Sequence, residues 1–342
     1  MSGSNQGQAP GAGWGPPQVP RNRLSSWETV SEVFASHRSP RYAALARALA
    51  GDRRFEEVGP PLIVLAAVRL AALEGRATDP WGGDAGAFRS DVAALGDEIA
   101  ARVRRGLVQF TEPLRVADLL PGLFLAARRY PGLPVHLVEG GSCAGFLLAP
   151  DRFDVTYPRA RWRPDGAAAS LTSDLDVPPG LLDGELKIGR RVGIDLAPVD
   201  PGDPASATLL RSFAWEGEPA RERRLLEGLR AVAGRPPEAL EGHAEELLPG
   251  VAEEMVSPGS LTVVIDSGFS RYLPMRSALA MAAQVKRLAA RGPLVAITRR
   301  AHSPRRDLPC AIQVADLTRP WSLTYADGDV LSERTRWLGG PQ

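Results

Sequence analysis

The stretch Val135-His136-Leu137-Val138-Glu139-Gly140-Gly141-Ser142-Cys143-Ala144-Gly145-Phe146 decides the fold class that this sequence predicts. Its apolar run, 135–138, is typical of a short buried strand, and the acid Glu139 ends it before a glycine-rich turn. Gly141 and Gly145 allow backbone angles and close approaches that other residues do not. Residues 144–148 can open a helix whose free N–H groups point at a ligand. Open α/β sheets build nucleotide and cofactor sites at their carboxyl edge in this way, although a tight strand-to-helix turn explains the glycines equally well.

Composition and charge describe an ordinary globular protein of 342 residues, long enough for one large domain or two modest ones. The formal net charge is +1, so no electrostatic argument favours nucleic acid or an anionic membrane as a partner. Two cysteines, Cys143 and Cys310, cannot form a disulfide framework, and the four histidines show no metal-ligand spacing. The apolar run 62–73 is too short to cross a bilayer. We therefore expect a cytoplasmic protein without a metal site.

The first part of the chain has a helical pattern. Residues 1–23 consist mainly of Gly, Pro, Ser, Gln and Asn and are predicted to form a disordered tail. Residues 24–130 are predicted to form a helical cap region, because N-cap residues, proline starts and glycine stops recur there. The expected helices begin near Ser25 and cover about 39–51, 62–74, 88–105 and 114–130, the last interrupted at Pro121-Gly122.

Residues 131–339 alternate between strand and helix patterns, which predicts a Rossmann-like α/β domain with a mostly parallel sheet. Further strands are expected at 192–196, 261–265, 294–297, 311–314, 322–325 and 330–336, and helices at 204–215, 219–232, 243–255 and 276–291. Asp327-Gly328 is typical of a hairpin, so the sheet should end in antiparallel strands. Segment 152–184 is rich in Pro, Asp, Arg and Gly and is predicted to be an insertion, a loop or small β-extension covering the site mouth.

Three acids follow predicted strands and are candidate site residues. Glu139 could hold a cofactor edge or simply be a solvated or capping acid. Asp195 ends the second strand, where an acid typically accepts hydrogen bonds from ribose hydroxyls. Its separation of 50 residues from Gly145 requires the insertion. Asp266 follows the strand 261–265 and is a candidate general base or a loop-initiating acid.

Two further features allow alternative interpretations. Cys143 stands where helix-terminal N–H groups could stabilise a thiolate, or it is merely a small residue that fits a turn. Gln109-Phe110-Thr111-Glu112 lies between two predicted helices and could line a pocket, with Glu112 as a second candidate base. A helix cap explains Thr111 and Glu112 as well.

The spacing Glu139-x-Gly141-x-Cys143-x-Gly145 resembles the first motif of S-adenosylmethionine-dependent methyltransferases, with cysteine at the middle glycine. Five longer stretches, at 61–75, 105–123, 137–153, 191–215 and 261–274, together resemble an uncharacterised bacterial family known as domain of unknown function 2332. The resemblance covers about residues 30 to 339. It implies a helical N-terminal region joined to a methyltransferase-like Rossmann fold, with an adenosine-type cofactor bound at Glu139, Gly141, Cys143, Gly145 and Asp195.

This sequence departs from the family pattern at four polar positions. Thr111, Leu147 and Ala197 stand where the family favours asparagine, and Asp266 stands where it favours histidine. Glycines and packing residues are retained while groups facing the presumed crevice change. The departures therefore indicate a divergent member with a different substrate or weakened catalysis.

Three functions follow as hypotheses. The first is an S-adenosylmethionine-dependent methyltransferase acting on a small molecule in bacterial secondary metabolism, chiefly by positioning the nucleophile against the methyl donor. The second is a catalytically degenerate Rossmann-like scaffold that binds a partner, which the four polar departures favour. The third is a nicotinamide enzyme, but the dinucleotide fingerprint places its last glycine three residues after the second, unlike this turn.

Overall fold

The computed structural model describes residues 61–80, 85–105, 109–214, 219–300, 311–319 and 321–325. The predicted tail 1–23, the helices near Ser25 and at 39–51, the Asp327-Gly328 hairpin and the strand at 330–336 lie outside these ranges. Within them, no helix combines the length and apolarity needed to cross a membrane.

A seven-stranded sheet forms the centre of the molecule, in the order β10-β9-β8-β7-β1-β5-β6. Its strands are β1 (Val135–Gly140), β5 (Ile188–Asp195), β6 (Glu238–Glu241), β7 (Leu261–Asp266), β8 (Leu294–Arg300), β9 (Ala311–Asp316) and β10 (Trp321–Tyr325). The strands from β8 to β6 are parallel to one another, and β9 is antiparallel to both its neighbours. The predicted Rossmann-like, mostly parallel sheet that ends in antiparallel strands is therefore confirmed. The edge strand β6 was not predicted, because its sequence Glu-Ala-Leu-Glu lacks an apolar run.

The central strand β1 lies at the point where the strand order reverses. It pairs in parallel with β5 on one side and β7 on the other, and Gly140 is in register with both Ile194 and Asp266. The predicted neighbourhood of the first two strands is confirmed. Because the three strands end together, the acids Glu139, Asp195 and Asp266 reach one edge of the sheet.

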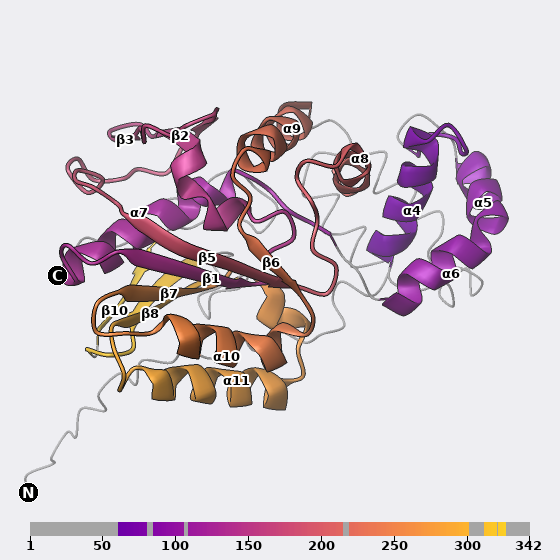
Figure 1. Cartoon of the computed structure of the whole chain (residues 1–342). Helices are drawn as coiled ribbons and strands as arrows, with labels where there is room; N and C mark the ends of the chain where they lie inside the picture. Colours follow the sequence, from indigo (N-terminus) through magenta and orange to yellow (C-terminus); the bar gives the residue numbers. More distant parts are fainter. Residues whose placement is uncertain are drawn as a thin grey trace, which may run out of the picture.

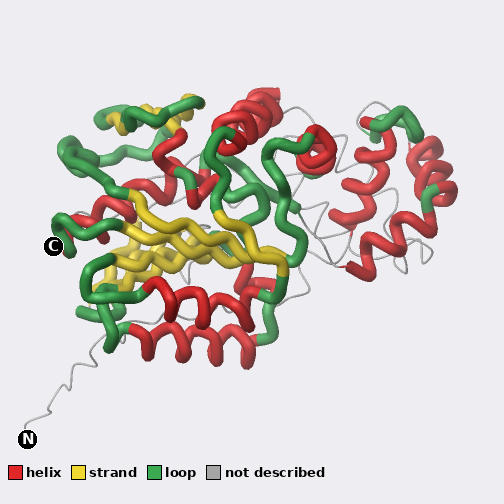
Figure 2. Tube along the Cα trace, viewed as in Figure 1, coloured by secondary structure: helices red, strands yellow, loops and turns green. Residues whose placement is uncertain are grey.

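Helices cover both faces of the sheet (Figure 1). Helix α7 (Arg115–Arg129) packs on one face, and α10 (Ala244–Met255) and α11 (Met275–Leu288) pack on the other. Side chains alternate along β1 accordingly: Leu137 belongs to the core on the α7 side and Val138 to the core on the α10 side. Figure 2 shows the strands as a single layer between these helices.

Helix α7 is continuous, although Pro121 was expected to divide it. The hydroxyl of the buried Tyr325 accepts a hydrogen bond from Gly122 N (2.8 Å) and donates one to Asp118 O (2.8 Å). Gly122 and Asp118 are four residues apart, so the hydroxyl replaces the direct backbone hydrogen bond at this point of the helix. Ala117 O, the carbonyl that Pro121 has no N–H to bond, accepts from Tyr157 Oη instead (2.7 Å), so two tyrosine hydroxyls keep the proline-containing helix intact.

The N-terminal helices are α4 (Pro61–Leu73), α5 (Ala85–Ala94) and α6 (Gly96–Arg105). The expected single helix over 88–105 is two helices, with a turn at Leu95. Helix α4 packs against α8 (Pro204–Ser212), which follows the loop after β5, and Arg69 Nε donates to Arg211 O (3.1 Å). This helical group therefore lies beyond the carboxyl ends of the strands (Figure 1).

The predicted insertion contains a small three-stranded sheet of β2 (Phe153–Thr156), β3 (Arg161–Trp162) and β4 (Ala169–Thr172). It packs against α7, where Tyr157 Oη donates to Ala117 O (2.7 Å), and against α9 (Pro219–Ala233). The expectation that this β-extension covers the site mouth is wrong. Its apolar side chains, such as Phe153 and Trp162, are buried beside α7 on one face of the main sheet.

Candidate functional site at the carboxyl edge of the sheet

The glycine turn after β1 has an unusual backbone. Gly141 (φ +69°), Cys143 (φ +51°) and Gly145 (φ +73°) all lie in the left-handed region, which glycine adopts freely and cysteine adopts at a cost. The expected helix over 144–148 is not formed, because the chain makes two short 3₁₀ turns, Phe146–Leu148 and Pro150–Arg152. The glycine turn therefore does not lead directly into an α-helix whose N-terminus could bind an anion. The apolar residues after Gly145 enter the core instead.

Asp195 binds the glycine turn through its carboxylate. Oδ2 accepts a hydrogen bond from Cys143 N (2.8 Å), and Oδ1 accepts from Ala197 N (3.0 Å). Gln109 Nε2 also donates to Asp195 Oδ1 (3.3 Å) and to Ala197 O (2.9 Å). The sequence-predicted residues Asp195 and Cys143 are thus brought together, and Gln109 joins them from the helical region. Backbone geometry and these hydrogen bonds fix the conformation of the turn.

The space left by the glycines is filled by side chains of the chain itself. A Cβ added at Gly140 would lie 2.5 Å from the ring of Phe269, and one added at Gly141 would lie 2.6 Å from the Cβ of Phe269. A Cβ on Gly145 would lie 2.9 Å from Pro237 Cγ. The glycines therefore permit close internal packing. Phe269, in the 3₁₀ turn Phe269–Tyr272, carried no signal in the sequence that linked it to the turn.

Glu139 is buried, only 2% exposed, and its carboxyl group has one partner. Ser267 Oγ donates to Oε1 (3.0 Å), whereas no described residue donates a hydrogen bond to the buried Oε2. Burial raises the pKa of Glu139 well above its ordinary value, and the nearby negative charges of Asp195 and Asp266 add to the rise. Glu139 is therefore a buried carboxyl whose neutral form is favoured, rather than a solvated acid.

The two candidate bases are both held by other groups. Asp266 accepts from Gly268 N (2.9 Å) and from the hydroxyl of Ser270, so it stabilises the loop that follows β7. Glu112 pairs with two arginines of α9, with Arg221 Nε at 3.1 Å and Arg224 Nε at 3.2 Å. Among the described contacts, Asp266 and Glu112 bond different residues and do not share a partner.

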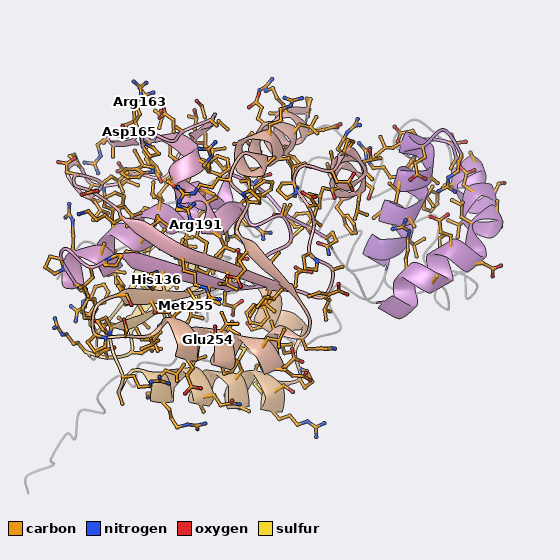
Figure 3. The ribbon with its side chains drawn as sticks, viewed as in Figure 1. His136, Arg163, Asp165, Arg191, Glu254 and Met255 are labelled. Atoms are coloured by element: carbon orange, nitrogen blue, oxygen red, sulfur yellow. The ribbon has the colours of Figure 1, made fainter. Side chains whose placement is uncertain are left out.

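Cys143 does not have the environment of a nucleophile. Burial raises the pKa of its thiol well above the ordinary value, and the Asp195 carboxylate raises it further. His136, one of the labelled residues in Figure 3, lies near the opposite end of β1 and accepts from Arg190 N through Nδ1 (2.9 Å). Among the described residues, no group of three His, Cys, Asp or Glu side chains could hold a metal ion.

A second feature of this edge is a cavity of about 410 Å³ between α4, α6 and α8. Gln109 and Ala197 form its wall toward the glycine turn. Its remaining described lining comes from the three helices: Ala66, Ala67, Glu98, Ala101, Arg102, Leu209, Ser212 and Phe213. The sequence placed Gln109 on a loop that could line a pocket, but gave no sign of the partners on α4 and α8.

Comparison with known proteins identifies the family of this chain but no relative of known function. No curated protein matches the chain. Two solved structures of the bifunctional kinase-methyltransferase WbdD are similar, each with 17% identity and a TM-score of 0.25. The matches cover 56% and 57% of this chain but only 29% and 32% of the WbdD chains, and so low a TM-score supports no conclusion about function. The model of the family described as an uncharacterized protein conserved in bacteria, domain of unknown function 2332, matches residues 25–326, and the chain belongs to this family.

Proposed function

We propose that this protein is a catalytically degenerate, methyltransferase-like scaffold. It binds a partner and does not transfer a methyl group. The observation that carries the proposal is the position of Phe269. Its side chain lies against Gly140 and Gly141, at the glycine turn where the sequence motif would require room for an adenosyl cofactor. In this conformation the ring occupies the space directly against the two glycines.

The pairing of the candidate bases supports the same proposal. A general base must be within hydrogen-bond reach of the proton that it removes. Asp266 is engaged by Gly268 and Ser270, and Glu112 by Arg221 and Arg224. Two of the departures from the family pattern, Leu147 and Ala197, replace side-chain amides with apolar groups near this edge.

The second candidate is an S-adenosylmethionine-dependent methyltransferase acting on a small molecule. It is favoured by Glu139 Oε2, to which no described residue donates, and by the half-buried Asp195, whose Oδ2 can accept a further hydrogen bond. Asp195 would then contact ribose hydroxyls, and the cofactor would supply an electrophilic methyl group. This candidate requires the Phe269 side chain to move away from Gly140 and Gly141.

Calorimetry with S-adenosylmethionine, S-adenosylhomocysteine and NAD tests the two candidates. We expect no saturable binding to the wild-type protein at millimolar concentration. We expect the Phe269→Ala variant, which opens the turn, to bind S-adenosylhomocysteine measurably more tightly than wild type. Leu273→Ala is the control, because Leu273 packs against the same core cluster but is not among the atoms nearest the glycines.

Saturable wild-type binding of either adenosyl compound, weakened at least tenfold by Asp195→Ala, would overturn the scaffold proposal and establish the second candidate's site. A tenfold loss corresponds to about 1.4 kcal/mol, within the range of one charge-assisted hydrogen bond. Saturable binding of NAD alone would overturn both candidates and favour a nicotinamide enzyme.

A further inference from the structure

The cavity between α4, α6 and α8 has the size and lining of a small-molecule site. Its volume of about 410 Å³ falls within the range of about 300–1,000 Å³ that is typical of ligand pockets. Ala66, Ala67 and Phe213 make a buried apolar floor, each of them 5% exposed or less. The cavity is built mainly by helices and adjoins the predicted cofactor site, because Gln109 and Ala197 in its wall both bond Asp195.

One polar group in the cavity wall has no partner among the described residues. Gln109 is 4% exposed, and no described residue donates a hydrogen bond to its buried Oε1. The orientation of this amide is fixed chemically, because Asp195 Oδ1 and Ala197 O are both acceptors and must face Nε2. A buried carbonyl oxygen without a partner is unfavourable by about 1–3 kcal/mol. A ligand with an N–H or O–H group would remove this cost.

A second polar group in the lining also favours a donor. Ser212 Oγ donates its hydrogen to Leu209 O (2.6 Å), so its oxygen is left to accept. The charged residues of the cavity, Glu98 and Arg102, pair with each other (3.3 Å) and add no net charge. The polar groups therefore select a neutral molecule that donates hydrogen bonds.

We infer that this cavity binds a neutral, mainly apolar small molecule that presents an N–H or O–H donor to Gln109. Aromatic compounds of the indole and phenol class have this combination of an apolar body and one donor. The site goes beyond the proposed scaffold function, and it does not depend on whether the glycine turn binds an adenosyl cofactor.

Indole, phenol and indene are suitable probes for calorimetry on the full chain. Indole and indene have nearly the same shape, but only indole has an N–H group. We expect indole and phenol to bind saturably, and indene to bind at least tenfold more weakly than indole. One hydrogen bond to a buried acceptor supports a factor of this size.

Two variants test the location. Ala101 is exposed and belongs to the cavity lining, so Ala101→Phe should block the cavity without disturbing the core and should abolish indole binding. Ala93 is exposed on the neighbouring helix α5 and is not part of the described lining, so Ala93→Phe should leave indole binding unchanged. Far-UV circular dichroism of both variants confirms that the fold is retained.

Three results would overturn the inference. The first is the absence of saturable binding by both indole and phenol. The second is unchanged indole affinity in a folded Ala101→Phe protein, which would place the site elsewhere. The third is equal affinity for indole and indene, which would remove the hydrogen bond to Gln109.

Discussion

The glycine turn and the Gln109 cavity lie at the same edge of the sheet, but they differ in how their space and polar groups are used. At the turn, Phe269 fills the room beside Gly140 and Gly141, and the Asp195 carboxylate accepts from the backbone of Cys143. In the cavity, about 410 Å³ stays open beside a Gln109 oxygen to which no described residue donates. The region with a recognisable motif is closed, and the region without one is open.

This difference shows which structural property a glycine motif predicts. Glycine is selected wherever the backbone must be left-handed or must come close to another atom, whichever atom that is. At Gly141 and Gly145 the backbone is left-handed and the close atoms belong to Phe269 and Pro237. The motif therefore predicts the conformation of the turn, and the room for a ligand has to be established separately.

The largest expected effect is at Gly141. Gly141→Ala places a Cβ at φ +69° and 2.6 Å from Phe269 Cβ. Left-handed strain of about 1–2 kcal/mol and overpacking of about 1–3 kcal/mol should together lower the free energy of unfolding by about 2–5 kcal/mol. Urea denaturation measures this loss.

A matched glycine separates the two contributions. Gly132 has a similar φ of +82° but no atom within 4 Å of an added Cβ, so Gly132→Ala should lose only the strain, about 1–2 kcal/mol. Combining Gly141→Ala with Phe269→Ala should recover the overpacking part in a double-mutant cycle. Equal losses at Gly141 and Gly132, without coupling to Phe269, would show that the turn is not closed by this ring.

A smaller effect is expected at Asp195, the residue that connects the turn with the Gln109 cavity. Asp195→Ala removes the acceptor of three hydrogen bonds, from Cys143 N, Ala197 N and Gln109 Nε2. We expect unfolding to become easier by about 1.5–3 kcal/mol, because hydrogen bonds to a charged group contribute more than neutral ones. Thermal or urea unfolding of the purified variant measures the change.

Asp200 provides the comparison. It accepts from Gly202 N (2.8 Å) in an exposed loop, so Asp200→Ala should change stability by no more than about 0.5 kcal/mol. If the two variants were equally stable, Asp195 would not be the residue that holds the turn.

Much of the fold followed from local pattern. Apolar runs bounded by turns located β1, β5 and β7, and proline starts located α4, α8 and α9 within a few residues. Two predictions that failed, the missed strand β6 and the expected break in α7, have physical causes. β6 is a polar edge strand. α7 tolerates Pro121 because Tyr157 donates to Ala117 O, the carbonyl that Pro121 has no N–H to bond. Tyr325 bridges the next pair of backbone groups, Gly122 N and Asp118 O.

The candidate site was less predictable than the fold. Acids at strand ends identified Glu139, Asp195 and Asp266 as residues of one edge, since parallel strands end together. Their partners come from distant segments: Ser267 contacts Glu139, and Gln109 contacts Asp195. Packing between distant segments also decides whether space remains, and a single sequence contains no local signal for it.

The smallest expected effect, counted per pH unit, concerns Glu139, which is the exception within the closed region because no described residue donates to its Oε2. Its pKa is raised in the folded protein, chiefly by burial, so the folded state holds this proton at pH values where the unfolded state has released it. The stability that the neutral carboxyl contributes is complete below the unfolded pKa and is lost as the pH rises toward the folded pKa. Stability should therefore fall with rising pH above about 4.5, at no more than about 1.4 kcal/mol per pH unit for one proton.

Glu139→Gln isolates this contribution, because glutamine keeps the shape and an oxygen for Ser267 but cannot lose a proton. The variant should have nearly wild-type stability below pH 4.5 and should become more stable relative to wild type as the pH rises. Glu246→Gln, at an exposed position of α10, should show no such divergence. A wild-type advantage that grows with pH would mean that a charged Glu139 stabilises the fold. Oε2 would then have an unrecognised donor, and the glycine turn would be open to a cationic or hydrogen-bonding ligand after all.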